Sequence, residues 1–165
     1  MSNVDSYDRI PSRSTVGDMT ETDTACVFCE IAAGREGAGR VLFEDERTIA
    51  FLDHTAVMPG HTLVVPRVHA ADIWEISTED AATVMRTVHS MAARIRDVLR
   101  PDGLTLFQAN RSAGWQDVFH LHVHLVPRAT GDHLTRPWVA SAKRDEELAA
   151  VRALLLDGRS SPLEP

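Results

Sequence analysis

The sequence predicts an α+β domain built on a largely antiparallel five-stranded sheet, with one long helix and a C-terminal helix. Three short apolar runs follow one another closely between residues 40 and 66, a long amphipathic segment comes next, and two further apolar runs end at residue 127. Strands joined by tight turns pair antiparallel, whereas a parallel sheet needs a crossover helix between its strands. The single long helix among these runs therefore favours α+β over an alternating βαβ fold.

Each expected strand is a run of β-branched, aromatic and aliphatic residues bounded by charged or turn-forming residues. Met58-Pro59-Gly60 marks the turn before the third strand, and the loop RSAGWQDV separates the last two. The expected strands are RVLFED (40–45), TIAFLD (48–53), HTLVVP (61–66), LTLFQAN (104–110) and FHLHVHLVP (119–127).

The long helix is expected between Ser77, whose hydroxyl can cap the first turn, and Pro101-Asp102-Gly103, which ends it. KRDEELAAVRALLLD (143–157) predicts a second amphipathic helix near the end of the chain. The apolar residues of the long helix follow the three-four spacing of one buried face: Ala81, Val84, Met85, Val88, Met91, Ala92, Ile95, Val98 and Leu99.

Length and composition limit the classes of function. A chain of 165 residues, 44% of them hydrophobic, predicts one globular domain, and a formal charge of -7 argues against a nucleic-acid binder. The sequence lacks both the roughly 18 consecutive apolar residues of a membrane span and the apolar core of a signal peptide, so we expect a cytoplasmic protein without a membrane partner. Residues 1–24 are acidic and poor in apolar side chains, which predicts a flexible extension.

Three histidines alternate with apolar residues in the last expected strand. On a strand of period two, His120, His122 and His124 share one face, and the residues between them share the face toward the core. A solvated face rarely carries three imidazoles, and the outer two lie about 13 Å apart along a strand, so at most part of the row holds one zinc ion. A neutral imidazole is also a nucleophile toward phosphorus near neutral pH.

Cys26 and Cys29 form a C-x-x-C pair. Two cysteines cannot build a disulfide framework, so reduced thiols acting as metal or redox ligands are expected. A thioredoxin-like redox pair belongs at a strand-to-helix junction of a parallel fold, which this sequence does not predict. Zinc therefore fits the pair better.

The H-x-H-x-H segment resembles the histidine triad (HIT) family of nucleotide hydrolases and transferases. Four blocks appear in the family's order and approximate spacing, over about residues 25 to 132: CVFCEI, FEDERTIAFLD, PGHTLVVPRVH and AGWQDVFHLHVHLVPR. The resemblance implies a HIT-like fold, with a HIT domain at 25–135, a C-terminal extension at 136–165 that contains a helix, and a homodimer whose two sheets join.

The resemblance also implies roles for single residues. His122 is similar to the family's nucleophile, which attacks the α-phosphorus of a nucleotide, and His124 and His61 match residues that contact the phosphate or the leaving group. Asp53 matches the carboxylate that binds the ribose, although a turn-forming aspartate is the alternative. Asn110 and Gln116 match amide donors beside the phosphate. The apolar purine slot is matched by Val27, Phe28, Ile31, Phe51 and Leu63, of which the last three are equally consistent with plain core.

A four-ligand structural zinc site is implied in a bacterial-type branch of the family. Its matching residues here are Cys26, Cys29, His69 and His120. Two thiolates with two imidazoles suit tetrahedral zinc, and a closed site of this kind stabilises a fold without taking part in catalysis.

Some residues depart from the family pattern. Trp115 stands where many members have glycine, Asp117 stands where many have serine or threonine, and His54 replaces a common apolar residue. Because His124 is kept where the transferase branch carries glutamine, hydrolysis is favoured over nucleotidyl transfer. The substrate expected is a purine nucleotide derivative, either a dinucleoside polyphosphate or a nucleoside phosphoramidate. Two alternatives remain: a nucleotide-binding protein with little turnover, and a zinc hydrolase with His122 and His124 as ligands.

Overall fold

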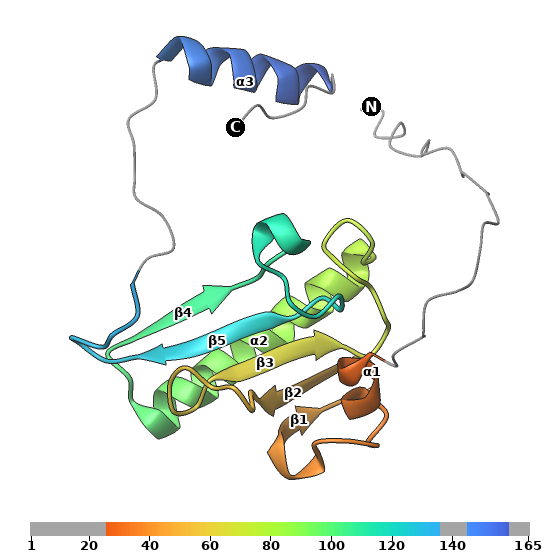
Figure 1. Ribbon diagram of the computed structural model, residues 1–165, viewed down its shortest axis with the longest axis vertical. Helices are drawn as coiled ribbons and strands as arrows, with labels where there is room; N and C mark the ends of the chain where they lie inside the picture. Colours follow the sequence, from red (N-terminus) through yellow and green to blue (C-terminus); the bar gives the residue numbers. More distant parts are fainter. Residues whose placement is uncertain (1–25, 136–144, 159–165) are drawn as a thin grey trace, which may run out of the picture. The chain divides into compact units, whose positions relative to one another are not determined.

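The computed structural model describes residues 26–135 and 145–158 (Figure 1). The chain divides into two compact units, one reaching Thr130 and one starting at Gly131. The first unit contains α1 (Val27–Ala32), η1 (Ala38–Arg40), β1 (Val41–Glu44), β2 (Thr48–Leu52), β3 (Thr62–Pro66), α2 (Thr78–Leu99), β4 (Gly103–Phe107), η2 (Ser112–Gly114) and β5 (Val123–Arg128). The described helix of the second unit is α3 (Asp145–Asp157).

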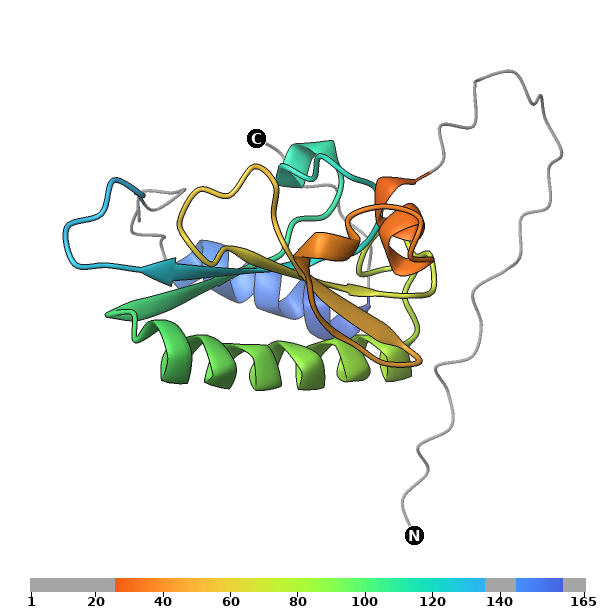
Figure 2. The same cartoon turned by 90° about the horizontal axis from the view of Figure 1, so that it is seen from below.

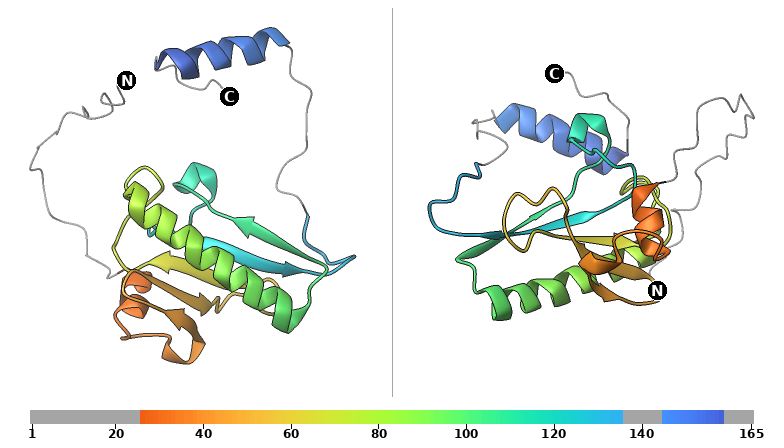
Figure 3. Two further views of the ribbon diagram at one scale, coloured as in Figure 1. Left: turned by 180° about the vertical axis from the view of Figure 1, so that it is seen from behind. Right: turned by 60° about the horizontal axis from the view of Figure 1, so that its bottom comes forward.

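The five strands form one antiparallel sheet in the order β1-β2-β3-β5-β4. Helix α2 crosses one face of the sheet, whereas α1 and η2 lie on its other side (Figures 2 and 3). Residues alternate between two apolar clusters because successive strand residues point to opposite faces. Ala50, Val64 and Leu125 face α2, and the neighbouring residues Phe51 and Leu63 face α1.

The long helix begins and ends where the sequence predicts. The hydroxyl of Ser77 accepts a hydrogen bond from the backbone N–H of Asp80 at 3.1 Å, which satisfies one of the free donors of the first turn. At the other end Arg100 adopts a left-handed conformation, and its N–H donates to the carbonyl of Arg96. The buried residues Val84, Val88, Met91 and Ile95 confirm the centre of the expected apolar face. The expectation is wrong for Met85, Val98 and Leu99, which are at least half exposed because they lie beside the face that packs on the sheet or beyond its last contact.

The α+β class, the five-stranded antiparallel sheet and both helices are confirmed, with two shorter strands. β4 ends at Phe107 rather than at residue 110, and β5 begins at Val123 rather than at residue 119. Before Val123 the chain is bonded to loops: the N–H of Leu121 donates to the carbonyl of Ala70 at 2.7 Å. The helix α1 was not expected from the sequence.

Several expectations concern residues that the structure does not describe. The flexible extension at 1–24 lies outside the described residues, as do 136–144 and the first two residues of the expected second helix. Among the described helices, none has the length and apolarity that crossing a membrane requires.

Candidate active site

The three histidines of the H-x-H-x-H segment point away from α2, as the alternation predicts. His120 and His122 precede β5, and His124 lies on it opposite Leu63 of β3. The ring of His122 meets the ring of His124 at a centroid distance of 4.8 Å and that of Phe28 at 5.1 Å. The pairing of β3 with β5 also brings His61, next to the start of β3, against His124.

The hydrogen bonds of His122 determine which of its nitrogens is free. Its Nδ1 lies 2.7 Å from the carbonyl O of His120, and a carbonyl only accepts. The proton of the neutral ring therefore belongs on Nδ1, and Nε2 keeps its lone pair. Burial lowers the pKa of His122 below its usual value, which favours the neutral ring at pH 7.

A second chain of contacts orients His124. The backbone N–H of Val57 donates to Nδ1 of His61 at 3.4 Å, which leaves the proton of His61 on Nε2. That Nε2 lies 2.9 Å from Nδ1 of His124, so His124 accepts there and carries its own proton on Nε2. Burial, together with the neighbouring rings of His122 and His61, lowers the pKa of His124 to about 4.

Asp53 follows β2 and supports the same corner. Burial alone raises its pKa, but hydrogen bonds from the N–H and hydroxyl of Thr55, both at 2.9 Å, bring the pKa below its usual value. These bonds occupy Oδ1 and close a tight turn, so Asp53 has the turn-forming contacts that the sequence offered as the alternative to ribose binding. The other oxygen, Oδ2, lies 3.5 Å from Nδ1 of His61.

A cavity of about 340 Å³ opens beside the triad. It is lined by His122, His124 and Asp53, and by all five residues of the expected purine slot: Val27, Phe28, Ile31, Phe51 and Leu63. Four of these five also belong to the apolar cluster under α1, so the same side chains form core and cavity wall. The cavity thus combines apolar side chains with the polar groups of the triad and Asp53, as small-molecule sites do.

The two expected amide donors do not line this cavity. Gln116 is 3% exposed, and its amide N donates to the carbonyls of Ala71 and Val118 at 2.6 and 3.0 Å. The amide N of Asn110 donates to Gln108 at 2.8 Å, and its oxygen accepts from the N–H of Ile73. Both amides thus hold loops in place. Because both N–H groups of the Gln116 amide are occupied, a contact of Gln116 with phosphate requires one of its bonds to break.

Cys26, Cys29, His69 and His120 come together at the start of α1. Cys29 Sγ lies 3.3 Å from Nδ1 of His69 and 3.5 Å from Nδ1 of His120, and one ligand atom from each of the four residues lies within 4.8 Å of the others. Nε2 of His120 donates to the carbonyl of Pro66 at 2.9 Å, which leaves the lone pair on Nδ1 facing the sulfurs. Bond lengths of about 2.3 Å to sulfur and 2.0 to 2.1 Å to nitrogen place tetrahedral zinc ligands at such separations.

Comparison with known proteins shows to which family the chain is related. The family model described as HIT domain matches residues 35–131. A protein of Bacillus subtilis named Protein hit is 39% identical over 118 residues, which are 71% of this chain and 81% of that protein. The chain belongs to the HIT family.

Other HIT proteins extend the comparison. Adenylylsulfatase HINT3 of Arabidopsis thaliana is 30% identical over 123 residues, 74% of this chain and 60% of that protein. The crystal structure of a HIT family member from Bacillus subtilis matches with a TM-score of 0.76 at 34% identity, over 84% of this chain and 99% of that one. A Zn-bound histidine triad family protein from Mycobacterium smegmatis matches with a TM-score of 0.61 at 34% identity, over 82% of this chain and 98% of that one.

This HIT protein has cavity residues to which the sequence assigned no function. His54 lies 3.7 Å from Asp53, and Asp117 lines the wall near His122. Thr55 had a signal in the sequence, because a threonine two residues after an aspartate is typical of a turn capped by its side chain. The remaining three, Glu36, Arg40 and Val118, had no such signal, because only the folded chain brings them to the cavity.

Proposed function

We propose that this HIT protein hydrolyses a purine nucleotide derivative at its α-phosphorus, through a nucleotidyl-histidine intermediate on His122. The observation that carries the proposal is the 2.7 Å contact of His122 Nδ1 with the carbonyl of His120, in a ring that lines the cavity. It leaves the Nε2 lone pair free to attack phosphorus. The relative named adenylylsulfatase supports an adenylyl group as the nucleotide part of the substrate.

The reaction has two steps. In the first, Nε2 of His122 forms a bond to the α-phosphorus, and the electron pair of the broken bond goes to the leaving group. A leaving phosphate departs as the anion, whereas a leaving amine nitrogen takes up a proton from solvent as the bond breaks and departs as the neutral amine. The Nε2–H of His124 donates a hydrogen bond to the leaving atom as charge develops there. In the second step a water oxygen bonds to phosphorus, the electron pair of the N–P bond returns to His122, and a proton from the water passes to solvent.

The cavity supplies the nucleoside site of the proposal. Its apolar wall of Val27, Phe28, Ile31, Phe51 and Leu63 suits the flat faces of a purine, and Oδ2 of Asp53 accepts from a ribose hydroxyl. His61 acts through His124, whose ring it orients. Gln116 holds the loop before the triad, and with Asn110 it stays a predicted contact of the phosphate. The substrate is a dinucleoside polyphosphate or a nucleoside phosphoramidate.

Zinc is proposed as a structural ion held by Cys26, Cys29, His69 and His120. The set of two thiols and two imidazoles matches a closed tetrahedral site, and the Zn-bound relative from Mycobacterium smegmatis supports it. Bound zinc ties α1 to the segment before β5. The ion thereby stabilises the wall of the cavity that Val27 and Phe28 form.

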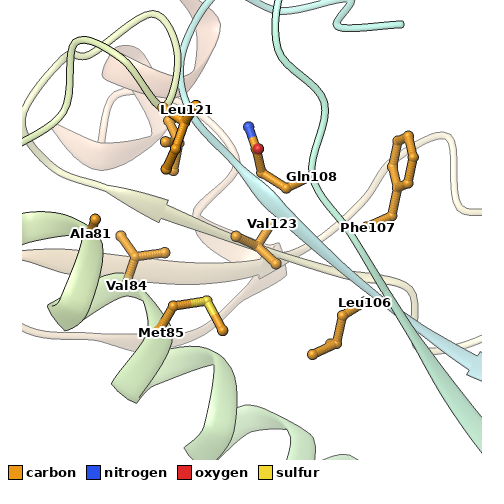
Figure 4. A pocket seen from close by; sticks show the side chains of 9 residues that line it. Ala81, Val84, Met85, Leu106, Phe107, Gln108, Leu121 and Val123 are labelled. Carbon is orange, nitrogen blue, oxygen red and sulfur yellow. The ribbon is translucent and has the colours of Figure 1, made fainter. Parts of the chain in front are cut away.

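A homodimer joined through β4 is also proposed. Within the described residues β4 has one neighbouring strand, β5, so one of its edges is free to pair. An apolar hollow lies between β4 and α2, with Leu106 and Met85 about half exposed at its rim (Figure 4). Pairing of two β4 edges joins two sheets into one and covers these side chains.

Substitution of His122 tests the proposed reaction. In His122→Asn the shorter amide retains a donor near the carbonyl of His120 but has no nucleophilic nitrogen. We expect kcat/KM for adenosine phosphoramidate to fall by about 10³-fold or more, while the Kd for AMP changes less than about threefold. Rapid quenching of the wild-type protein in base, with radiolabelled substrate, is expected to trap an acid-labile nucleotidyl adduct that the variant does not form.

Three results contradict the proposal. Undiminished turnover by His122→Asn shows that His122 is not the nucleophile. Nucleotide binding by the wild type without turnover indicates a binding protein. Loss of turnover on chelation, with no adduct at any time, indicates a zinc hydrolase that uses metal-activated water.

A further inference from the structure

An exposed aromatic pair adjoins the triad on the side away from the nucleoside cavity. Trp115 is 57% exposed, and its ring stacks on the ring of Phe107 with centroids 6.4 Å apart and planes inclined by 22°. The ring of Phe107 in turn lies 5.8 Å from the ring of His124. Trp115, Phe107 and His124 thus form a continuous series of rings, which we call the aromatic platform.

The strand places Phe107 on the face of the triad. In Figure 4 the side chains of Phe107 and Leu106 point to opposite sides of β4, and Leu106 points toward the hollow beside α2. Phe107 is also paired with His124 in the register of β4 and β5. The ring of Phe107 therefore lies on the histidine face of the sheet, although Phe107 is the last residue of the edge strand β4 and also borders the hollow on the other face.

The loop presents Trp115 in a fixed but costly conformation. Its φ of 70° and ψ of 29° are left-handed, which costs a residue with a Cβ about 1 kcal/mol that glycine does not lose. Hydrogen bonds hold the loop: the N–H of Trp115 donates to Ser112, and Oε1 of Gln116 accepts from the N–H of Arg111 at 2.6 Å. Nothing in these backbone contacts requires an indole, so the side chain itself calls for an explanation.

The position of the platform matches the path of a leaving group. His124 lines the nucleoside cavity, whereas Phe107 and Trp115 do not. In a displacement at phosphorus the nucleophile and the leaving group occupy opposite sides of the reacting atom. With the nucleoside in the cavity and His122 attacking, the leaving group passes to His124, and the next surface that it meets is the aromatic platform.

We propose that Trp115, stacked on Phe107, binds an aromatic ring in the leaving group and so makes this protein selective for substrates that carry one. The inference rests on the proposed function and names the substrate class of the same site. Two sources share this chemistry: the second base of a dinucleoside polyphosphate, and the ring of an aromatic amine in a nucleoside phosphoramidate. The exposed carboxylate of Asp117 lines the nucleoside cavity near His122, where it repels the additional phosphate groups that a dinucleoside polyphosphate brings to the triad. The aromatic amine is therefore the source that the charges favour.

The test compares two adenosine 5′-phosphoramidates that differ only in the amine, tryptamine or hexylamine, whose basicities are similar. We expect the wild-type kcat/KM to favour the tryptamine compound by about tenfold, equivalent to about 1.4 kcal/mol. In Trp115→Ala the ratio falls to about one, and Trp115→Phe restores part of it. Phe43→Ala is the matched control, because Phe43 is an exposed aromatic residue on β1 at the opposite edge of the sheet, and we expect this variant to keep the ratio.

Diadenosine tetraphosphate is the third substrate. A larger effect of Trp115→Ala on its hydrolysis than on that of the tryptamine compound identifies the second base as the ring that is bound.

A binding measurement separates this inference from the proposed function. The Kd values of the two phosphoramidates are measured on His122→Asn, with and without Trp115→Ala. If the wild type turns over neither compound but the Kd preference depends on Trp115, the result supports ring binding by the aromatic platform and contradicts the proposed hydrolysis. If both are hydrolysed with a ratio that Trp115→Ala leaves unchanged, the platform is overturned. A change of oligomeric mass in Trp115→Ala with an unchanged ratio also overturns it, and assigns the ring to an interface between copies.

Discussion

Three chemically identical side chains in the H-x-H-x-H segment receive three different roles from their hydrogen-bond partners. His120 donates through Nε2 to Pro66 and turns Nδ1 to the cysteines, whereas His122 donates through Nδ1 to the backbone and keeps Nε2 free. His124 accepts at Nδ1 from His61 and presents Nε2–H. The alternation of the sequence predicts the shared face, but these tautomers depend on carbonyls and rings brought from distant parts of the chain.

The half-buried ring of His124 makes stability depend on pH. Its pKa of about 4 lies below the roughly 6.5 of an unfolded histidine. The groups that face it are His122 and His61, which lower the pKa, and Asp53, which raises it. Between these values the unfolded chain binds a proton that the folded protein does not, so stability falls as the pH drops from about 6.5 toward 4.

Unfolding by urea at several pH values measures this contribution. We expect the wild type to lose about 1 to 2 kcal/mol more than His124→Gln between pH 6.5 and 4.5, with allowance for the partial exposure of the ring. Glutamine keeps hydrogen-bonding capacity but does not titrate. Parallel stability curves for the two proteins contradict the assignment of a neutral His124.

Among the elements, those with long periodic patterns followed from the sequence and the short ones did not. The three-four spacing from Ala81 to Leu99 and the cap at Ser77 define α2 locally. The six residues of α1 span fewer than two turns, too few for a period to be recognised, and the cap residue Cys26 offers no side-chain hydrogen bond. Residues 119–122 alternate like a strand, yet the N–H groups of His120 and Leu121 bond to the loop residues Val118 and Ala70, which no local pattern reveals.

The candidate site divides in the same way. The family resemblance predicted the five residues of the purine slot. They lie on β2, β3 and α1 and meet only in the folded protein. The amide of Gln116 was expected at phosphate and is found bonded to backbone, since the shape of its loop is set by a left-handed Trp115 and by Arg111 at a φ of 60°. The type of a side chain predicts which contacts it can make, and the tertiary structure decides which partner it contacts.

If the proposed zinc ion is bound, we expect α1 to depend on it for stability, because so short a helix gains little from its own hydrogen bonds. Protein purified without chelator is expected to contain near one zinc ion per chain by elemental analysis. In Cys29→Ser we expect the zinc to be lost and the Tm to fall by several degrees or more. The exposed His89 on α2 supplies the control His89→Asn, which keeps both zinc and Tm. A fully folded wild type without metal, as stable as Cys29→Ser, contradicts the site.

At the scale of the whole molecule the two edges of the sheet differ. β1 has four residues and a register shift between Val41 and Phe43, and an irregular short edge discourages pairing with another chain. β4 pairs with β5 in continuous register over all five of its residues and has the apolar hollow of Figure 4 beside it. The regular edge is therefore the one on which the proposed pairing with a second copy is placed.

Substitution at this edge tests the proposed dimer. The wild type is expected to sediment at twice the 18.2 kDa of one chain, and Leu106→Lys at 18.2 kDa, because a lysine from each copy places like charges in a desolvated interface. Val98→Lys is the matched control: Val98 is 71% exposed near the end of α2, outside the hollow, and its substitution is expected to leave the mass unchanged. A wild-type monomer, a Leu106→Lys dimer, or dissociation by Val98→Lys each contradicts pairing through β4. Since Leu106 points away from the triad, the monomeric variant is expected to keep the affinity for AMP within about threefold, which separates assembly from nucleotide binding.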